Sequence, residues 1–159
     1  MVAGMERRTT PKNEFSWRGL TAIEFLIMRD LLRQEYAVNG FYIFKQILLG
    51  FLGPVKEDMS NKEFKRVLST IWSREPDKAA TIMTKYNPGV PSYQRVQRAL
   101  MTLEEYGWVH SRKVEGTKAN LVWYISEDII KLTKNQLKTD EVLRTRLGVN
   151  PGVDYGLIY

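Results

Sequence analysis

The side chains best suited to a binding chemistry lie in the polar segment that begins at Ser92 and in the basic segment that follows it. Arginine can donate two hydrogen bonds to guanine, and glutamine can both donate to and accept from adenine. Lysine and arginine also neutralise backbone phosphates. With the serine and tyrosine that begin the segment, the candidate DNA contacts are Ser92, Tyr93, Gln94, Arg95, Gln97, Arg98, Arg112, Lys113 and Lys118. These residue types indicate an interface with double-stranded DNA.

A helix is expected to position the first group of candidates. Ser92 is a suitable N-cap, and apolar residues from Val96 to Leu103 recur with helical periodicity. Gln94 and Arg98 then point directly away from the core. The positions beside them are Tyr93, near the helix start, and Arg95 and Gln97, which flank the outward pair. This surface fits the major groove, although the same side chains would also suit a helix face that is simply solvated.

A β-hairpin is expected to position the second group. Gly107 ends the helix, and two runs of aromatic and β-branched residues, "WVHSRKV" and "NLVWYIS", are joined by the glycine-containing turn "EGTKA". Arg112, Lys113 and Lys118 lie on or near the tip of this hairpin. From there they would reach the sugar-phosphate backbone beside the helix that reads the bases.

The hairpin also carries aromatic residues, Trp108, Trp123 and Tyr124, and the only histidine, His110. Exposed aromatic rings beside basic residues bind unpaired bases, whereas a hairpin packed on a helical core turns at least some of its rings inward. His110 has no recognisable serine, cysteine or other matched partner. We therefore expect it to be a surface or hydrogen-bonded strand residue and not a catalytic base.

Four helices are expected before this segment. Their approximate ranges are 21–36, 41–52, 61–72 and 76–86. Thr21 with Glu24 and Ser60 with Glu63 have the spacing of capping boxes, and Asn39 and Gly40 are expected to end the first helix. Helix, turn, helix and hairpin is the order of a winged helix. The expected fold class is therefore mainly α (α+β), a winged helix-turn-helix with additional helices and a two-stranded wing.

We expect one domain with additions at both ends. Residues 17–126 would form the winged-helix domain, with inserted helices at about 55–87. Residues 1–16 would be a flexible basic arm, either a loose terminus or a phosphate contact. Residues 127–159 would hold a C-terminal helix and a tail. That tail either covers the core or docks on another chain, as a dimerisation segment or as the site of a protein partner.

Composition narrows the classes of function. The 159 residues include 24 Lys and Arg against 18 Asp and Glu, and the net charge of +6 attracts phosphate polyanions. With no cysteine and one histidine, disulfides, thiolate zinc sites and multi-histidine metal sites are excluded. No phosphate loop, paired catalytic carboxylates or nucleophile elbow is recognisable, so we expect neither an enzyme nor a cofactor. Without a signal peptide or membrane span, the expected localisation is cytoplasmic.

Three pieces of the chain, "LTAIEFLIMRDLL", "GFYIFKQI" and the segment from Ser92 to Ser126, together resemble a winged-helix regulator of the PadR type. The resemblance covers residues 20–46 and 92–126. It implies a homodimer without a cofactor. It also implies DNA contacts from Ser92, Tyr93, Gln94, Gln97 and Arg98 on the helix and from Arg112, Lys113 and Lys118 on the wing.

The chain departs from the PadR pattern in two places. Residues 50–90 hold two extra helices, and the short helix at 76–86 competes with "GFYIFKQI" for the place before the recognition helix. The region after Ser126 is shorter than the long helices with which such regulators form dimers. Dimerisation is therefore an expectation from the resemblance and not from the pattern.

The leading hypothesis is a sequence-specific double-stranded DNA-binding protein, most simply a transcriptional regulator. Replication or partition of a plasmid or phage is a related alternative that uses the same DNA contacts. A different class is a winged-helix docking or assembly module with little DNA binding. The apolar stripe from Phe41 to Phe51 and the apolar tail favour that second class.

Overall fold

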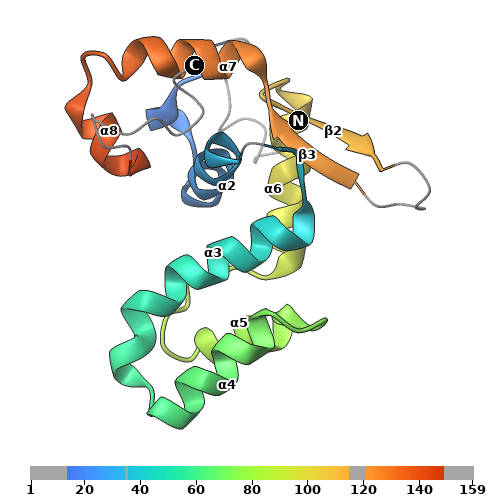
Figure 1. Cartoon of the computed structure of the whole chain (residues 1–159), viewed down its shortest axis with the longest axis vertical. Helices are drawn as coiled ribbons and strands as arrows, with labels where there is room; N and C mark the ends of the chain where they lie inside the picture. The colour runs from blue at the N-terminus through green and yellow to red at the C-terminus, as the bar shows by residue number, and fades with distance from the viewer. Residues whose placement is uncertain (1–13, 35, 115–120, 149–159) are drawn as a thin grey trace, which may run out of the picture.

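The structure, a computed structural model, describes residues 14–34, 36–114 and 121–148. Within these ranges the protein is mainly helical, with seven α-helices, two short 3-10 helices and a small sheet (Figure 1). In chain order the elements are η1 (Trp17–Gly19), α2 (Ala22–Arg33), β1 (Val38–Asn39), α3 (Gly40–Val55), η2 (Lys56–Asp58), α4 (Asn61–Ile71), α5 (Pro76–Met83), α6 (Tyr93–Glu105), β2 (Val109–Lys113), β3 (Leu121–Ile125), α7 (Glu127–Gln136) and α8 (Glu141–Leu147). No helix in these ranges has both the length and the apolar character needed to cross a membrane.

The sheet is antiparallel and has three strands in the order β1-β3-β2. The hairpin of β2 and β3 was expected, but β1 was not, and it pairs Val38 with Trp123. Asn39 and Gly40 therefore do not end the first helix, which stops at Arg33. Instead, Asn39 caps α3, because its side-chain oxygen accepts from the backbone N–H of Tyr42 at 2.7 Å. A two-residue strand is too short to produce a periodic pattern, so no local signal indicated it.

The expected helix caps form with one difference. Thr21 and Glu24 make the full capping box at the start of α2. Ser60 caps α4 by accepting from the backbone N–H of Glu63. The carboxylate of Glu63, however, accepts a hydrogen bond from the hydroxyl of Tyr86, which raises the pKa of that phenol. Glu63 thus ties α4 to the segment after α5.

The main core lies between α2, α3, α6 and the sheet (Figure 1). Ile27 of α2, Phe44 of α3 and Leu100 of α6 are completely buried there. Trp108 and Trp123 are also buried, as expected for a hairpin packed on helices, whereas Tyr124 is partly exposed. Burial of such large aromatic side chains contributes strongly to the free energy of folding.

The chain between α3 and α6 forms a separate helical layer at the lower end of the molecule (Figure 1). Helix α3 extends from the sheet into this layer, where α4 and α5 pack against each other and against α3. Val67 and Ile71 of α4 and Met83 of α5 are fully buried. These two helices are the additional helices expected at about 55–87.

The region after the hairpin forms two short helices, where a single C-terminal helix was expected. The break falls at Asp140, whose side chain accepts from the backbone N–H of Leu143 and caps α8. That hydrogen bond is the main reason that the pKa of Asp140 is lowered. Leu147 is fully buried, and its carbonyl accepts from the guanidinium of Arg33. Helix α8 therefore packs back on α2.

Candidate nucleic-acid interface

Helix α6 has the buried face that its periodicity predicted. Val96, Leu100 and Leu103 are fully buried. Ser92 caps the helix by accepting from the backbone N–H of Arg95 at 3.2 Å, so its hydroxyl already has a structural role. Tyr93 follows Ser92, and its backbone N–H donates to the carboxylate of Asp77 on α5. These contacts fix both the rotation of α6 and the position of its first turn.

The outward face of α6 carries three of the expected contact residues. Gln94, Arg95 and Arg98 are exposed. Within the described part of the chain neither guanidinium forms an ion pair. Their donors therefore face solvent and are available to base edges or phosphates. Further along the same face, Met101 is 59% exposed and the acidic Glu105 is exposed. The amide and guanidinium side chains of this face are therefore confined to its first two turns.

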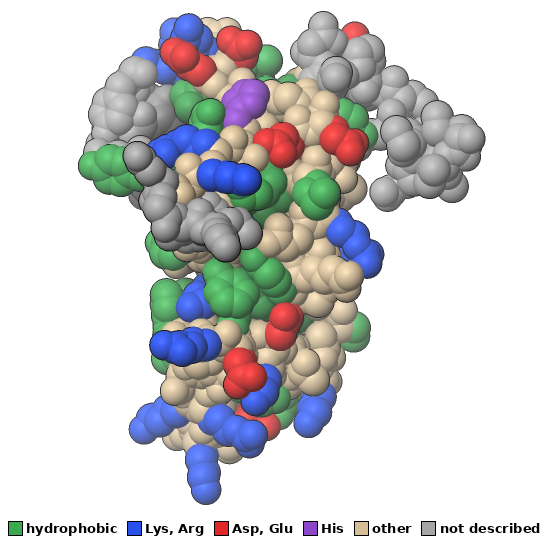
Figure 2. All heavy atoms as spheres, turned by 90° about the vertical axis from the view of Figure 1, so that its right-hand side faces the viewer, with side chains coloured by type: hydrophobic (Ala, Val, Ile, Leu, Met, Phe, Trp, Pro, Cys, Tyr) green, Lys and Arg blue, Asp and Glu red, His purple; other side chains and the backbone are tan. Residues whose placement is uncertain are grey.

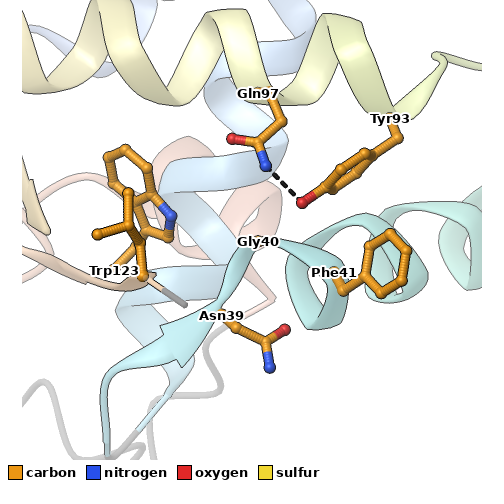
Figure 3. A pocket seen from close by; sticks show the side chains of 7 residues that line it. Asn39, Gly40, Phe41, Tyr93, Gln97 and Trp123 are labelled. Atoms are coloured by element: carbon orange, nitrogen blue, oxygen red, sulfur yellow. Dashed lines mark hydrogen bonds between the residues drawn. The ribbon is translucent and has the colours of Figure 1, made fainter. Parts of the chain in front are cut away.

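Tyr93 and Gln97 lie on a flank of α6 that another element partly covers. The side-chain amide of Gln97 donates to the hydroxyl of Tyr93, and both side chains are half-buried (Figure 3). The Tyr93 ring packs edge-on against Phe41, with centroids 4.7 Å apart. The cause is the start of α3, which approaches so closely that a Cβ atom at Gly40 would lie 3.3 Å from the Gln97 nitrogen. A helical wheel cannot include such a neighbour.

The hairpin presents two further candidates. Arg112 and Lys113 are exposed on β2, and Lys118 lies outside the described residues. The position of β2 is fixed by Glu104 near the end of α6. Its carboxylate accepts from the backbone N–H of Ser111 at 2.9 Å and from the Ser111 hydroxyl at 2.6 Å. Glu104 therefore holds the hairpin to α6.

Helix α3, rather than α5, runs alongside the first half of α6 (Figure 3). Phe41 and Phe44 of α3 both contact the ring of Tyr93. Helix α5 meets α6 at its first residue, through Asp77. The helix "GFYIFKQI" therefore supports the candidate reading helix, and α4 and α5 form an insertion between them.

A pocket of about 310 Å³ opens beside α6, on the side of Tyr93 and Gln97 (Figure 3). Its lining residues come from four elements and are Asn39, Gly40, Phe41, Tyr93, Gln97, Leu121 and Trp123. Most of them were not candidates in the sequence, where Phe41 was named only as the start of an apolar stripe. One signal in the sequence could have indicated that Phe41 lies at the surface. Lys45, a charged residue in an otherwise apolar run, follows it by four positions and therefore lies on the same side of the helix.

The face shown in Figure 2 carries charges of both signs. Over its lower part, where α4 and α5 lie, Lys and Arg side chains outnumber those of Asp and Glu. Lys62, Lys65 and Arg66 are exposed on α4 and contribute to the basic character of this layer. Among the described residues, no group of three or more histidine, aspartate and glutamate side chains is placed to hold a metal ion.

No protein-family model, curated protein or solved structure matches this chain. Its function is therefore inferred from the chemistry and geometry of the residues described above.

Proposed function

We propose that the protein is a winged-helix protein that binds double-stranded DNA and regulates transcription. Helix α6 would lie in the major groove, and the β2–β3 hairpin would contact the backbone beside it. The order of α2, β1, α3, α6 and the hairpin, with β1 paired to β3, supports this assignment. In helix-turn-helix proteins the second helix reads base edges mainly through its N-terminal residues.

One observation carries the proposal. Gln94, Arg95 and Arg98 are exposed together on the first two turns of α6, without ion-pair partners in the described part of the chain. Arg112 and Lys113 are exposed on the strand that Glu104 holds against the same helix. Base-reading donors and phosphate-binding cations are thus supplied by adjacent elements, as specific DNA binding requires.

The contacts of α6 narrow the set of residues that would read bases. The hydroxyl of Ser92 caps the helix, and Tyr93 and Gln97 contact each other and the start of α3. We therefore assign direct readout to Gln94, Arg95 and Arg98, and backbone contact to Arg112 and Lys113. Lys118 keeps the backbone contact that is expected from its place in the hairpin turn.

The proposed functional unit is a homodimer that reads two half-sites about one helical turn apart. The net charge of +6 would attract the protein to DNA before specific contacts form.

Selection of bound sequences from random duplex DNA tests the proposal. The expected result is enrichment of a palindromic site by the wild-type chain and loss of preference at one position in each half-site by Arg98→Ala. Enrichment of a single, asymmetric half-site would contradict the dimer. The absence of any enrichment would contradict base reading by α6.

A second candidate function, protein docking by the same helix, is favoured by Met101. This apolar side chain lies on the outward face of α6 and is 59% exposed, next to the acidic end of the helix. A docking module would bind random duplex weakly at all salt concentrations. A DNA-binding protein would instead show an affinity that falls steeply as salt rises, because bound phosphates release counterions.

A further inference from the structure

We propose that the protein has a second nucleic-acid site, which binds unpaired nucleotides of a single strand. One base would enter the pocket beside α6, and the next phosphate and base would lie on Lys45 and Trp72. This site goes beyond the proposed duplex-binding role and does not depend on it.

The pocket has aromatic walls on opposite sides of a glycine (Figure 3). Trp123, which is only 2% exposed, closes one side of the pocket, and Phe41, which is 36% exposed, forms the other side with Tyr93 next to it. Phe41 is therefore the ring that is open to a stacked base. A volume of about 310 Å³ is at the lower end of the range for small-ligand pockets and suits a single planar ring system. Aromatic side chains bind bases of any sequence because every base has a π-face.

Gln97 and Tyr93 supply polar atoms beside the aromatic rings of the pocket. The Gln97 amide nitrogen donates to the Tyr93 hydroxyl. Among the described residues, the Gln97 carbonyl oxygen and the Tyr93 hydroxyl hydrogen have no further partner and are available to a ligand. The carbonyl oxygen is drawn on the side of Gln97 that faces Trp123 (Figure 3). An acceptor beside a donor complements the hydrogen-bonding edge of a nucleobase, which also presents both kinds of group.

Gly40 keeps this arrangement open. A Cβ atom at this position would lie 3.3 Å from the Gln97 nitrogen and 3.4 Å from the Tyr93 oxygen. Both distances are at the short limit of van der Waals contact, so a methyl group would press on the two side chains that form the polar edge. Gly40 is thus a position where a small change should alter the pocket with little effect elsewhere.

A row of alternating rings and charge continues from the pocket. The ammonium nitrogen of Lys45 lies 5.7 Å from the centroid of Phe41 and 6.0 Å from that of Trp72. Phe41 is 36% exposed and Trp72 is 51% exposed, so both rings have a surface open to solvent. A cation between two exposed rings can hold a phosphate while the rings stack on neighbouring bases.

The space-filling view agrees with a continuous surface of this kind. Where the upper part of the molecule meets the lower layer of α4 and α5, Figure 2 shows hydrophobic side chains grouped together with basic side chains beside them. An apolar protein segment would cover the rings but would leave the ammonium of Lys45 without a counter-charge. A single nucleic-acid strand supplies both bases and phosphates, and we therefore assign the site to it.

Fluorescence anisotropy of a labelled twelve-residue oligothymidylate provides the test. Trp72→Ala is expected to weaken binding about tenfold, since one stacked base is worth roughly that factor. Gly40→Ala is expected to weaken it severalfold. The matched control is Tyr124→Ala, which removes an exposed ring that neighbours Trp123 but points to the opposite face of the strand. Equal affinity of the wild type and both test variants would overturn the proposal.

Two further measurements distinguish a single-strand site from a site for free nucleotides and from the duplex surface. Thymidine monophosphate should displace the oligonucleotide only at far higher concentration. Displacement at the same concentration would overturn the single-strand assignment and give the pocket to free nucleotides. Trp72→Ala should weaken oligothymidylate binding more than Arg98→Ala does, because Arg98 belongs to the outward face of α6 and does not line the pocket. If duplex reading by α6 fails its own test while Trp72→Ala still weakens the oligonucleotide, the second site stands alone.

Discussion

The outward face of α6 and the pocket on its other side differ in how their side chains are brought together. Gln94 and Arg98 come from two successive turns of one helix, so their alignment follows from helical geometry. The pocket combines Gly40, Gln97 and Trp123 from three elements, and only packing brings them together. One helix can therefore carry one surface that the sequence predicts and another that only the packing of other elements creates.

The largest expected effect is that of Trp123→Ala, because Trp123 is the buried ring of the pocket and part of the core. This ring is 2% exposed, lines the pocket and belongs to the strand at the centre of the sheet. Its removal should lower the free energy of unfolding by about 3–5 kcal/mol, as measured by urea denaturation. Trp123→Phe should cost less because it retains an aromatic ring. A loss below about 1 kcal/mol for the alanine variant would contradict the role of this ring in holding the pocket side of the fold together.

The next effect concerns α2, the helix on which both regions are built. Burial raises the pKa of Asp30 to about 6, against the opposing charges of Arg29 and Arg33. Because the folded pKa lies above the unfolded one, the stabilising contribution of the protonated form is complete below pH 3.8 and is lost as pH rises through about 6. Asp30→Asn should therefore stabilise the protein by up to about 3 kcal/mol at pH 8.

The pH dependence distinguishes the ionisation of Asp30 from a general effect of the substitution. Denaturation of the wild type and Asp30→Asn should give a difference that shrinks as pH falls from 8 to 4. Neither binding region contains Asp30, so this stability change should leave the ratio of duplex to single-strand affinity unchanged. A difference in stability that is the same at both pH values would contradict the raised pKa.

Arg98→Ala should have an effect of intermediate size, and it should act on the outward face of α6 and not on the pocket. Loss of one two-donor contact should cost about 1–3 kcal/mol on the selected duplex and much less on random duplex. Lys138→Ala is the matched control. It also removes one exposed positive charge, but from the turn between α7 and α8, on the opposite side of the molecule from strands β2 and β3 (Figure 1). Equal losses for the two variants would reduce the role of α6 to general charge attraction.

The smallest predicted effect is that of Glu104→Ala on the affinity for duplex DNA. Its direction is opposite to the one that the change in charge alone would produce. Glu104→Ala removes a negative charge, yet it should weaken duplex binding by about 1 kcal/mol because the hairpin loses two hydrogen bonds to α6. Glu105→Ala removes an equivalent exposed charge and should instead strengthen binding slightly. The affinities of the Glu104→Ala and Glu105→Ala variants for duplex DNA are measured by titration at the same salt concentration. Stronger binding by both variants would contradict the positioning role of Glu104.

Local signals in the sequence predicted the elements and their caps well. Thr21, Ser60 and Ser92 cap the helices that they were expected to cap, because capping depends on a few adjacent residues. The hairpin was also expected, with at least some of its aromatic rings turned inward. One error concerns Asn39, which begins α3 where it was expected to end a helix. The covering of Gln97 by the start of α3 was not foreseen. Both depend on elements that are distant in sequence.

The sequence by itself determined the buried and outward faces of α6, since a period of 3.6 residues and the apolar positions fix the rotation of a helix. It also determined that cations would lie on the hairpin beside that helix. Only the tertiary structure decided which flank of α6 would be covered, because the approach of Gly40 is a long-range packing event. The tertiary structure likewise placed Lys45 between Phe41 and Trp72. The contact of Lys45 with Trp72 arises because α4 folds back against α3, and no local sequence pattern encodes it.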